Sequence, residues 1–258
     1  MPKLCESEIE KMTIEELVEL GYTYLSGPDI APDAPFAERK SYGDVLLRKR
    51  LTDAVARLNP SLPYDVVLEA VNKVSRISSS NLIADNETFH KMLVDGVPVE
   101  YRKNGEMVGD YVRLVDFSEE GTDNNEFLVV NQFTVFENNN NKRLDILLFI
   151  NGIPMVLFEL KNPADENATI RKAYDQICTY KATIPSLFIY NEICVISDGL
   201  EAKAGSLTAP FSRFSAWKTK DGLTEASKFE DQLTTLIHGL CNKKTLLDYI
   251  RNFITFEK

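Results

Sequence analysis

Three residues in the middle of the chain have the types and spacing needed for metal-assisted hydrolysis. Asp145 lies near the start of one apolar run, and Glu159 and Lys161 lie at the end of the next, within RLDILLFINGIPMVLFELKNP (143–163). Mg²⁺ prefers oxygen ligands and commonly binds through one or two carboxylates plus water and substrate phosphate. The sequence therefore predicts a magnesium site at Asp145 and Glu159, with the backbone carbonyl of Leu160 as a third protein ligand.

This group of residues suits the hydrolysis of a phosphodiester. A hard cation polarises the phosphoryl oxygen, lowers the pKa of a bound water and stabilises the developing charge. Side chains two residues apart on a strand point to the same face, so Lys161 is expected beside Glu159. The lysine ammonium is then placed to orient the attacking water or to stabilise charge on the phosphorane.

The Glu-x-Lys triplet is by itself a weak signal. The chain contains three such triplets, at 38–40, 159–161 and 201–203. Only the middle one ends a strongly apolar run whose neighbouring run carries an aspartate near its start. Polar residues at strand ends are ordinary, and the alternative interpretation is that Asp145 merely pairs with Arg143 or Lys161.

A shared metal site places a demand on the register of this hairpin. A regular two-residue turn at Asn151-Gly152 pairs residues whose numbers sum to 303, which puts Asp145 opposite Phe158. Asp145 and Glu159 would then face opposite sides of the sheet, because a slip of one residue flips every side chain. We therefore predict a three-residue loop or a β-bulge near Gly152.

A helix expected over 169–185 supplies two further candidates. Gln176 and Tyr180 are four residues apart and share one helix face. A glutamine amide and a tyrosine hydroxyl directed at the carboxylates could bind phosphate or hold a metal ligand. The alternative is that this pair is only the edge of a helix that covers the core.

Periodicity indicates the remaining elements. Helical spacing, a Thr13–Glu16 capping box and Pro63 as a first helical residue indicate helices near 13–20, 43–59 and 63–74. The tail, 228–258, is expected to be helical and to end without a stop signal. From residue 97 the period changes to two, which predicts strands at 97–102, 107–117, 125–137, 143–150, 153–160, 186–190 and 193–197.

The overall charge limits the possible functions. A formal net charge of -10 and a pI of about 4.9 argue against a stand-alone protein that holds nucleic acid on a broad basic surface. A local basic segment remains, and it is a candidate for contacts with DNA phosphates or, alternatively, a solvated helix face; its residues are Arg39, Lys40, Arg48 and Lys49.

Other features indicate where the protein acts. The four cysteines are scattered, only two histidines are present, and no apolar run is long enough to span a membrane. We expect a soluble, cytoplasmic protein with free thiols and no membrane contact. The chain also has no GxxxxGK[ST] or GxGxxG phosphate-binding sequence.

The acidic pair, the lysine and the Gln-x-x-x-Tyr spacing together resemble the PD-(D/E)xK nuclease core with the QxxxY motif of its RecB-like branch. More closely, the chain resembles the N-terminal region of the restriction (R, or HsdR) subunit of type I restriction-modification enzymes. The resemblance covers nearly the whole chain, in GYTYLSG, ERKSYGDVLLRKRLTDAVARLNP, FHKMLVDGVPVEY, NEFLVVNQFTV, the 143–163 stretch, QICTYK, SLFIYNEICVISDG and RFSAWKT.

The resemblance implies a restriction-endonuclease-like α/β fold: a mixed central β-sheet flanked by helices, with helical N- and C-terminal additions. It implies one endonuclease domain over 1–258, with a helical and hairpin part at 1–120, a nuclease core at 121–200 and a C-terminal helical connector at 201–258. It also implies that Asp145, Glu159 and Lys161 are the cleavage residues and that Gln176 and Tyr180 are the accessory motif. Glu10 or Glu16 would match a further acidic residue of some related nucleases.

The same resemblance implies partners and cofactors. These are double-stranded DNA, the methyltransferase (M) and specificity (S) subunits, Mg²⁺, and the subunit's own C-terminal motor domains. ATP binding and translocation are expected only in those motor domains, because this chain, whose tail is expected to stop in mid-helix, looks like an N-terminal part of the subunit. Two alternatives remain: a non-cleaving docking module of the same fold, and a stand-alone endonuclease or junction resolvase.

Overall fold

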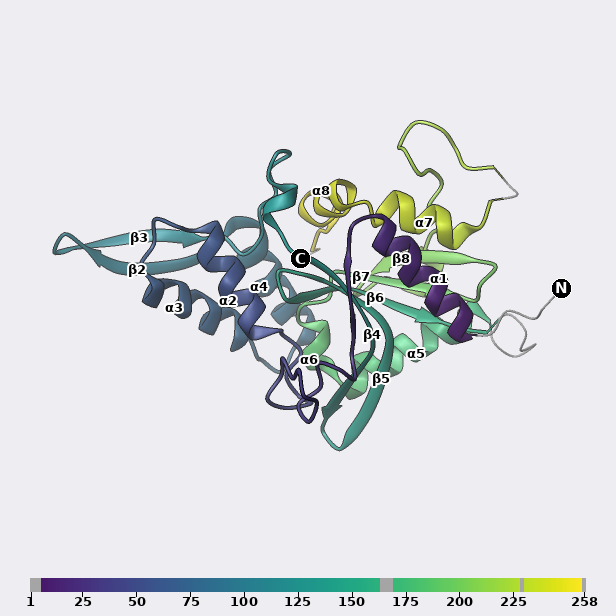
Figure 1. Cartoon of the computed structure of the whole chain (residues 1–258), viewed down its shortest axis with the longest axis horizontal. Coiled ribbons are helices and arrows are strands. Elements are labelled where there is room, and N and C mark those ends of the chain that lie inside the picture. Colours follow the sequence, from purple (N-terminus) through teal and green to yellow (C-terminus); the bar gives the residue numbers. More distant parts are fainter. Residues whose placement is uncertain (1–5, 163–168, 228–229, 257–258) are drawn as a thin grey trace.

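The computed structural model describes residues 6–162, 169–227 and 230–256 (Figure 1). The N-terminal part contains α1 (Glu6–Glu19), β1 (Thr23–Ser26), α2 (Arg48–Leu58), α3 (Tyr64–Ser75), α4 (Leu82–Asp95), β2 (Val97–Lys103) and β3 (Glu106–Val112). The rest contains η1 (Thr122–Asn124), β4 (Phe127–Glu137), β5 (Asn140–Ile150), β6 (Ile153–Leu160), α5 (Ile170–Thr183), α6 (Pro185–Phe188), β7 (Ile193–Ser197), β8 (Ala202–Ser206), η2 (Phe211–Arg213), α7 (Gln232–Leu240) and α8 (Lys243–Phe253).

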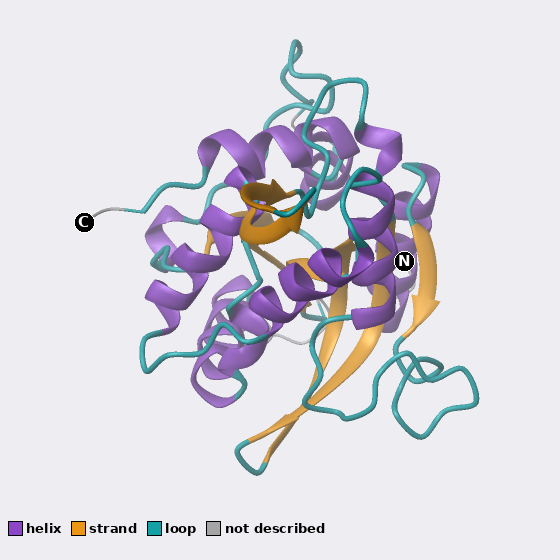
Figure 2. Cartoon of the chain, turned by 90° about the vertical axis from the view of Figure 1, so that its left-hand side faces the viewer, coloured by secondary structure: helices purple, strands orange, loops and turns teal. Residues whose placement is uncertain are grey.

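Six strands form one mixed sheet in the order β1-β4-β5-β6-β7-β8. The β1–β4 and β6–β7 pairs are parallel, and the other neighbours are antiparallel. Helix α7 packs against β8, α5 packs against β6 and β7, and Figure 2 shows helices on both sides of the strands. The predicted fold class, a mixed sheet flanked by helices, is confirmed.

The β5–β6 hairpin is the centre of the core. Every residue from Leu144 to Leu160 is buried, including the turn. Continuous apolar runs of this kind are typical of strands covered on both faces. Asp145 and Glu159 are the only carboxylates in this buried stretch, so folding removes both of them from contact with solvent.

The hairpin has the irregular register that the sequence predicts. Asn151 (φ +52°) and Gly152 (φ +80°) form a two-residue turn, and Ile150 pairs with Ile153. The register then shifts between Leu148 and Phe149, because Leu148 pairs with Val156 and leaves Met155 as an extra residue. Beyond this bulge Ile146 pairs with Phe158, and the next position along places Asp145 across from Glu159. The predicted bulge is confirmed.

One predicted strand is wrong. The segment SLFIY (186–190) does not form a strand; Pro185–Phe188 is instead the short helix α6. Proline at the first helical position is compatible with a helix, and a short apolar run does not by its pattern separate strand from helix. The next strand, β7, pairs parallel with β6. Parallel neighbours need a crossover, which α5 provides.

Several element boundaries also differ from those predicted. Thr13 does not cap α1, which already begins at Glu6; its hydroxyl donates instead to the Ile9 carbonyl at 2.8 Å. The helix expected from 43 begins at Arg48. The tail forms two helices, with Asn242 capping the second, and α8 ends at Phe253, so it does not stop in mid-helix. Strands β1 and β8 were not predicted. Strand β1 is short and pairs with the distant β4. Strand β8 forms a hairpin with β7, but its sequence, AKAGS, contains no β-branched or aromatic residue.

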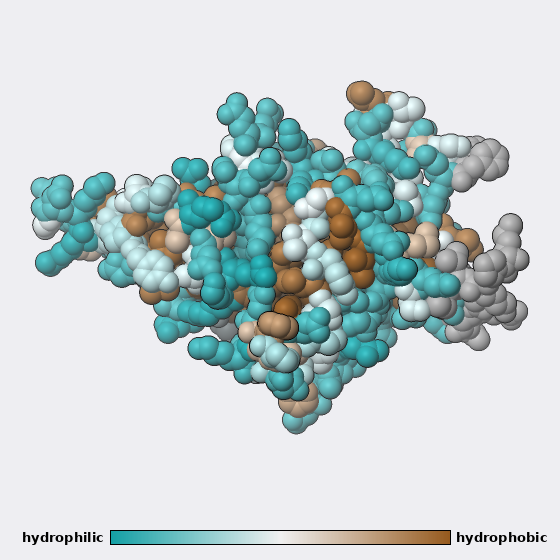
Figure 3. Space-filling model, in the orientation of Figure 1, coloured by the Kyte–Doolittle hydropathy of each residue, from teal (hydrophilic) through white to brown (hydrophobic). Residues whose placement is uncertain are grey.

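One face of the molecule is mainly polar, and a small hairpin projects from it. The β2–β3 hairpin forms a separate two-stranded sheet that projects from one end of the molecule (Figure 1). The face in Figure 3 is largely hydrophilic, with a limited apolar area near its centre. Within residues 6–162, 169–227 and 230–256, no helix combines the length and apolar character needed to cross a membrane.

Candidate active site

The two predicted carboxylates lie together inside the sheet. Asp145, on β5, is 9% exposed, and Glu159, near the end of β6, is 1% exposed. The Asp145 carboxylate accepts a hydrogen bond from the backbone N–H of Leu160 at 2.8 Å, so it reaches across to the strand that carries Glu159. The bulge therefore has a consequence at the site, because it brings the two carboxylates to one point.

Lys161 lies beside this carboxylate pair. Its ammonium forms an ion pair with Glu159, and its side chain is 21% exposed, against 2% for that of Glu159. The backbone N–H of Lys161 donates to the Ser197 carbonyl at 2.9 Å, which fixes the chain just after β6 against β7. The lysine thus links the buried carboxylates to the surface, on the same side as Glu159, as the strand period predicts.

Burial dominates the electrostatics of the group. It raises the pKa of Asp145 to about 6, although the Leu160 hydrogen bond and Lys161 oppose the shift. Burial, followed by repulsion from Asp145, raises the pKa of Glu159 to about 8. For Lys161, burial lowers the pKa, but the Glu159 and Asp145 charges outweigh it and the net shift is upward. Two carboxylates that resist ionisation side by side are an environment that favours an added cation.

The residues present fit a magnesium ion. Glu159 Oε2 is buried and has no hydrogen-bond partner among the described residues, so an acceptor is available at the centre of the group. In the described part of the chain, no three histidine, cysteine, aspartate or glutamate side chains form a metal-binding cluster. A donor set of two carboxylates, completed by a backbone carbonyl such as that of Leu160, water and phosphate, is the kind that Mg²⁺ uses.

The structure brings the predicted helix pair to the same place. Both Gln176 and Tyr180 are on α5, and the Tyr180 hydroxyl donates to the Arg143 carbonyl at 3.4 Å. Burial and then the charges of Glu159 and Asp145 raise the pKa of Tyr180, while hydrogen bonding to Gln176 opposes the shift. The charges of both carboxylates therefore act on Tyr180, and its hydroxyl is hydrogen-bonded to Gln176, one helical turn away.

Helix α1 adds acidic residues to the surroundings of the site. Charges on Glu6 and Glu10 contribute to the raised pKa of Asp145. Glu10 accepts hydrogen bonds from the side-chain amides of Asn131, at 2.7 Å, and Gln132 on β4. Glu16 is held elsewhere, by Thr234 at 2.7 Å. Of the two acidic residues considered from the sequence, Glu10 is therefore the one near the carboxylates.

Gln132 is a residue of the site that the sequence analysis missed. It has a positive φ of +52° in the middle of β4, and the ladder with β5 skips it, passing from Asn131–Ile146 to Phe133–Leu144. The skipped position on β5 is Asp145. Left-handed backbone is uncommon for residues other than glycine and tends to cluster at functional sites. The polar pair Asn131-Gln132 inside an apolar strand was the available signal.

The predicted DNA-contacting residues gather in a different place. Arg39, Lys40, Arg48 and Lys49 all line one large cavity, whose lining includes none of the three residues Asp145, Glu159 and Lys161. Lys40, Arg48 and Lys49 are exposed, whereas Arg39 is 4% exposed. The structure thus groups these four residues together but separates them from the carboxylates.

Fold and site together define a restriction-endonuclease-like α/β protein whose central sheet carries two carboxylates and a lysine. Residues 3–213 match the family model described as the N terminus of the type I restriction enzyme R protein. Because that match covers most of the chain, the chain belongs to this family.

Curated relatives agree with the family. The chain is similar to the type I restriction enzyme HindI endonuclease subunit of Haemophilus influenzae, with 42% identity over 99% of this chain and 24% of the relative. It is also similar to the putative type I restriction enzyme MjaIXP endonuclease subunit of Methanocaldococcus jannaschii, with 34% identity over 97% of this chain and 25% of the relative. The chain therefore spans about a quarter of the length of these two relatives.

Proposed function

We propose that this chain is the DNA-cleaving endonuclease domain of a type I restriction enzyme R subunit and that it hydrolyses DNA phosphodiesters with Mg²⁺. The observation that supports this most directly is the buried pair Asp145 and Glu159, with Lys161 against it and one Glu159 oxygen unpartnered. The family and the names of the relatives support the same activity.

Each residue of the group has a separate role in this proposal. Asp145 and Glu159 hold the cation, and the Leu160 carbonyl completes the protein ligands. When bound, Mg²⁺ polarises the scissile phosphate and lowers the pKa of water. Lys161 orients the attacking water and stabilises negative charge on the phosphate. Tyr180 and Gln176 hold the Glu159 carboxylate in place, and Glu10 adds to the negative potential that attracts the cation.

The proposal extends to partners that the relatives' names only suggest. In the intact enzyme, methyltransferase and specificity subunits would select and hold double-stranded DNA, and motor domains of the R subunit would bind ATP. The acidic net charge of this chain, -10, fits a domain that cuts DNA held by other parts. A cytoplasmic location, where these partners meet DNA, belongs to the same proposal.

Plasmid cleavage by the assembled enzyme tests the proposal. Asp145→Asn and Lys161→Ala are each expected to reduce the cleavage rate by at least about a hundredfold, because each removes a group that acts on the reacting phosphate. The measurement is the rate of DNA linearisation with Mg²⁺ and ATP, next to the rate of ATP hydrolysis. ATP hydrolysis is expected to stay at the wild-type level.

A matched control comes from another triplet in the same chain. Glu201 and Lys203 have the same spacing as Glu159 and Lys161 and form an ion pair of 2.8 Å, but Glu201 is exposed. Lys203→Ala is therefore expected to leave cleavage unchanged. Normal cleavage by both Asp145→Asn and Lys161→Ala would contradict the nuclease assignment and favour a non-cleaving docking module.

A further inference from the structure

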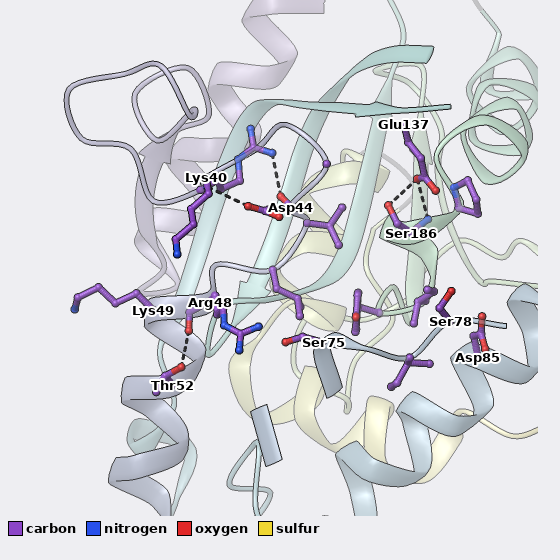
Figure 4. A pocket seen from close by; sticks show the side chains of 18 of the residues that line it. Lys40, Asp44, Arg48, Lys49, Thr52, Ser75, Ser78, Asp85, Glu137 and Ser186 are labelled. Atoms are coloured by element: carbon purple, nitrogen blue, oxygen red, sulfur yellow. Dashed lines mark hydrogen bonds between the residues drawn. The ribbon is translucent and has the colours of Figure 1, made fainter. Parts of the chain in front are cut away.

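A large cavity in the described part of the chain lies away from the carboxylate pair. Its volume is about 1180 Å³, and it lies between the 38–49 segment, helices α3 and α4, and the start of α6 (Figure 4). Figure 4 shows Lys40, Arg48 and Lys49 on one side of this space and Ser78, Asp85 and Ser186 on the other. A space of this size can hold a nucleotide and is large for an inorganic ion.

Arg39 is the strongest sign that this cavity takes a ligand. It lines the cavity and is 4% exposed, with its guanidinium 3.8 Å from the centre of the Phe133 ring. Nη1 donates to the carbonyls of Thr134, at 2.9 Å, and Asp44, at 3.2 Å. Nε and Nη2 are buried without a partner among the described residues. Buried cationic donors left unpaired are costly, so an acceptor is needed here.

The first turn of α2 provides a second, independent sign. Leu47 precedes this helix and supplies no side-chain cap, and the first turn contains no acidic residue. Three cations, Arg48, Lys49 and Arg50, follow in the turn where the helix dipole already carries positive charge. A helix N-terminus with cations in its first turn is a suitable place to bind an anion.

The carboxylates of the lining are mostly engaged by other groups. Asp44 accepts the backbone N–H groups of Lys40 and Ser41 at 3.0 Å, and Asp53 pairs with Lys49 at 2.7 Å. Three further bonds engage the remaining acidic residues: Ser79 N–H to Asp85, Ser186 hydroxyl to Glu137, and Arg50 to Glu38.

Two cations of the same lining are not neutralised by a carboxylate. The Lys40 ammonium has no hydrogen bond or ion pair within the described ranges, and the guanidinium of Arg48 donates to the neutral amide of Asn72. Together with Arg39, they are cations of this lining that no carboxylate contacts within the described ranges.

We propose that this cavity binds a nucleotide, with its phosphate at Arg39, Lys40 and the first turn of α2. The lining also contains apolar and aromatic side chains, among them Leu68, Ile77 and Tyr64, against which a base can pack. The nucleotide is either one unit of a DNA strand or a free mononucleotide, since both present the same phosphate and base. Binding here does not depend on Asp145 or Glu159, so it is separate from the cleavage reaction.

The test measures binding by the intact protein in the presence of EDTA, so that no cleavage takes place. One probe is a fluorescein-labelled single-stranded oligodeoxythymidine of 12 nucleotides, followed by fluorescence anisotropy. The other is deoxyadenosine 5′-monophosphate, followed by calorimetry. The test variant is the double substitution Lys40→Gln with Arg48→Gln, and the control is Lys11→Gln with Arg57→Gln. All four side chains are exposed, and both variants lose two positive charges.

The double substitution at Lys40 and Arg48 is expected to weaken binding of at least one probe by about tenfold or more, with melting temperatures equal to those of the control. A loss confined to the oligonucleotide, with a salt dependence reduced by about 0.7 for each lost phosphate contact, identifies a DNA strand as the ligand. A loss for the mononucleotide identifies a free nucleotide. Equal binding of both probes by test and control variants, or no binding by the wild type, would overturn the proposal.

Discussion

Glu159 is the residue on which the site depends. It is the more buried of the two carboxylates, its pKa is raised to about 8 by burial and by Asp145, and one of its oxygens has no partner in the described chain. The folded protein without a cation therefore disfavours the charged form of this side chain. A bound cation removes that disadvantage, because it supplies the missing positive charge.

Replacing Glu159 by glutamine is expected to have opposite effects with and without magnesium. In EDTA at pH 8, Glu159→Gln is expected to raise the melting temperature by roughly 2–8 °C, because no buried charge has to be accommodated. Addition of Mg²⁺ is expected to stabilise the wild type and not the variant. Differential scanning fluorimetry measures both effects, with Glu201→Gln as the exposed control. An equal response of wild type and Glu159→Gln to Mg²⁺ would contradict the metal site.

Tyr180 is expected to affect activity more than stability. Its hydroxyl lies near Glu159 and bonds to the Arg143 carbonyl, while its ring is part of the core. Tyr180→Phe keeps the ring, so we expect a cleavage rate reduced by about 10–100-fold, as for residues that orient metal ligands, with little change in melting temperature.

A control for Tyr180 lies on the same helix. The Tyr174 hydroxyl donates to the Ala209 carbonyl at 3.3 Å, on the part of α5 that faces η2. Tyr174→Phe is expected to cleave DNA at the wild-type rate. If the two phenylalanine variants were equally active, Tyr180 would have only a packing role.

Among the elements, the β5–β6 hairpin determines the geometry of the site. The turn at Asn151-Gly152 and the extra residue Met155 together set the register that places Asp145 across from Glu159. The turn is also a contact with another element, because the Gly152 carbonyl accepts the backbone N–H of Leu47, just before α2, at 2.9 Å. The hairpin and α2 are therefore fixed to each other.

Two turn glycines allow this contact to be measured. Gly152 has φ +80°, and a Cβ there would lie 2.6 Å from the Leu47 carbonyl and 2.9 Å from the Leu51 nitrogen. Gly105, in the β2–β3 turn, has φ +89° but nothing within 4 Å. Gly105→Ala is expected to cost only the backbone strain, about 1 kcal/mol, and Gly152→Ala at least about 3 kcal/mol. Urea unfolding measures both losses in the free energy of unfolding. Equal losses for the two variants would mean that α2 moves away from the added Cβ without an energetic cost.

At the scale of the whole molecule, buried polar contacts connect distant parts of the chain. His90 on α4 lies 3.1 Å from the carboxylate of Glu192, which precedes β7. The backbone N–H of Glu192 donates to the carbonyl of Met155, the bulge residue. Burial raises the pKa of Glu192, and His90 opposes the shift. Glu192 thus connects α4, through its side chain, to β6, through its backbone.

The stability of the protein is expected to depend on pH through Glu192. Its pKa is higher in the folded state than the unfolded value of 4.5, so unfolding releases a proton. Its stabilising contribution is present below about pH 4.5 and is lost as the pH rises through the folded pKa. Glu192→Gln cannot ionise, so its free energy of unfolding should fall less than that of the wild type between pH 5 and pH 8.

The size of this difference reports the shift at Glu192. Each unit by which the folded pKa exceeds the unfolded one contributes about 1.4 kcal/mol. Urea unfolding at several pH values gives the two curves. Parallel curves for wild type and Glu192→Gln would show that another group controls the dependence.

The sequence alone determined much of the fold and the core of the candidate site. Alternating and continuous apolar runs indicated β2 to β7, apart from the helix α6. The spacing of Asp145 and Glu159 predicted a three-residue loop or a bulge, because a regular two-residue hairpin would turn the two carboxylates to opposite faces. Gln176 and Tyr180 were predicted from helical periodicity, which places residues four apart on one face of a helix.

Only the tertiary structure decided the rest. Strand β1 forms through pairing with the distant β4, and β8 pairs with β7 although its sequence, AKAGS, has low strand propensity, so local propensity indicates neither. The choice of Glu10 over Glu16, the left-handed backbone at Gln132 and the burial of Arg39 depend on which elements pack together. The sequence shows where a charged residue lies along the chain, but only packing decides whether water reaches it. The exclusion of water raises the pKa of Glu159 and leaves two donors of Arg39 without a partner among the described residues.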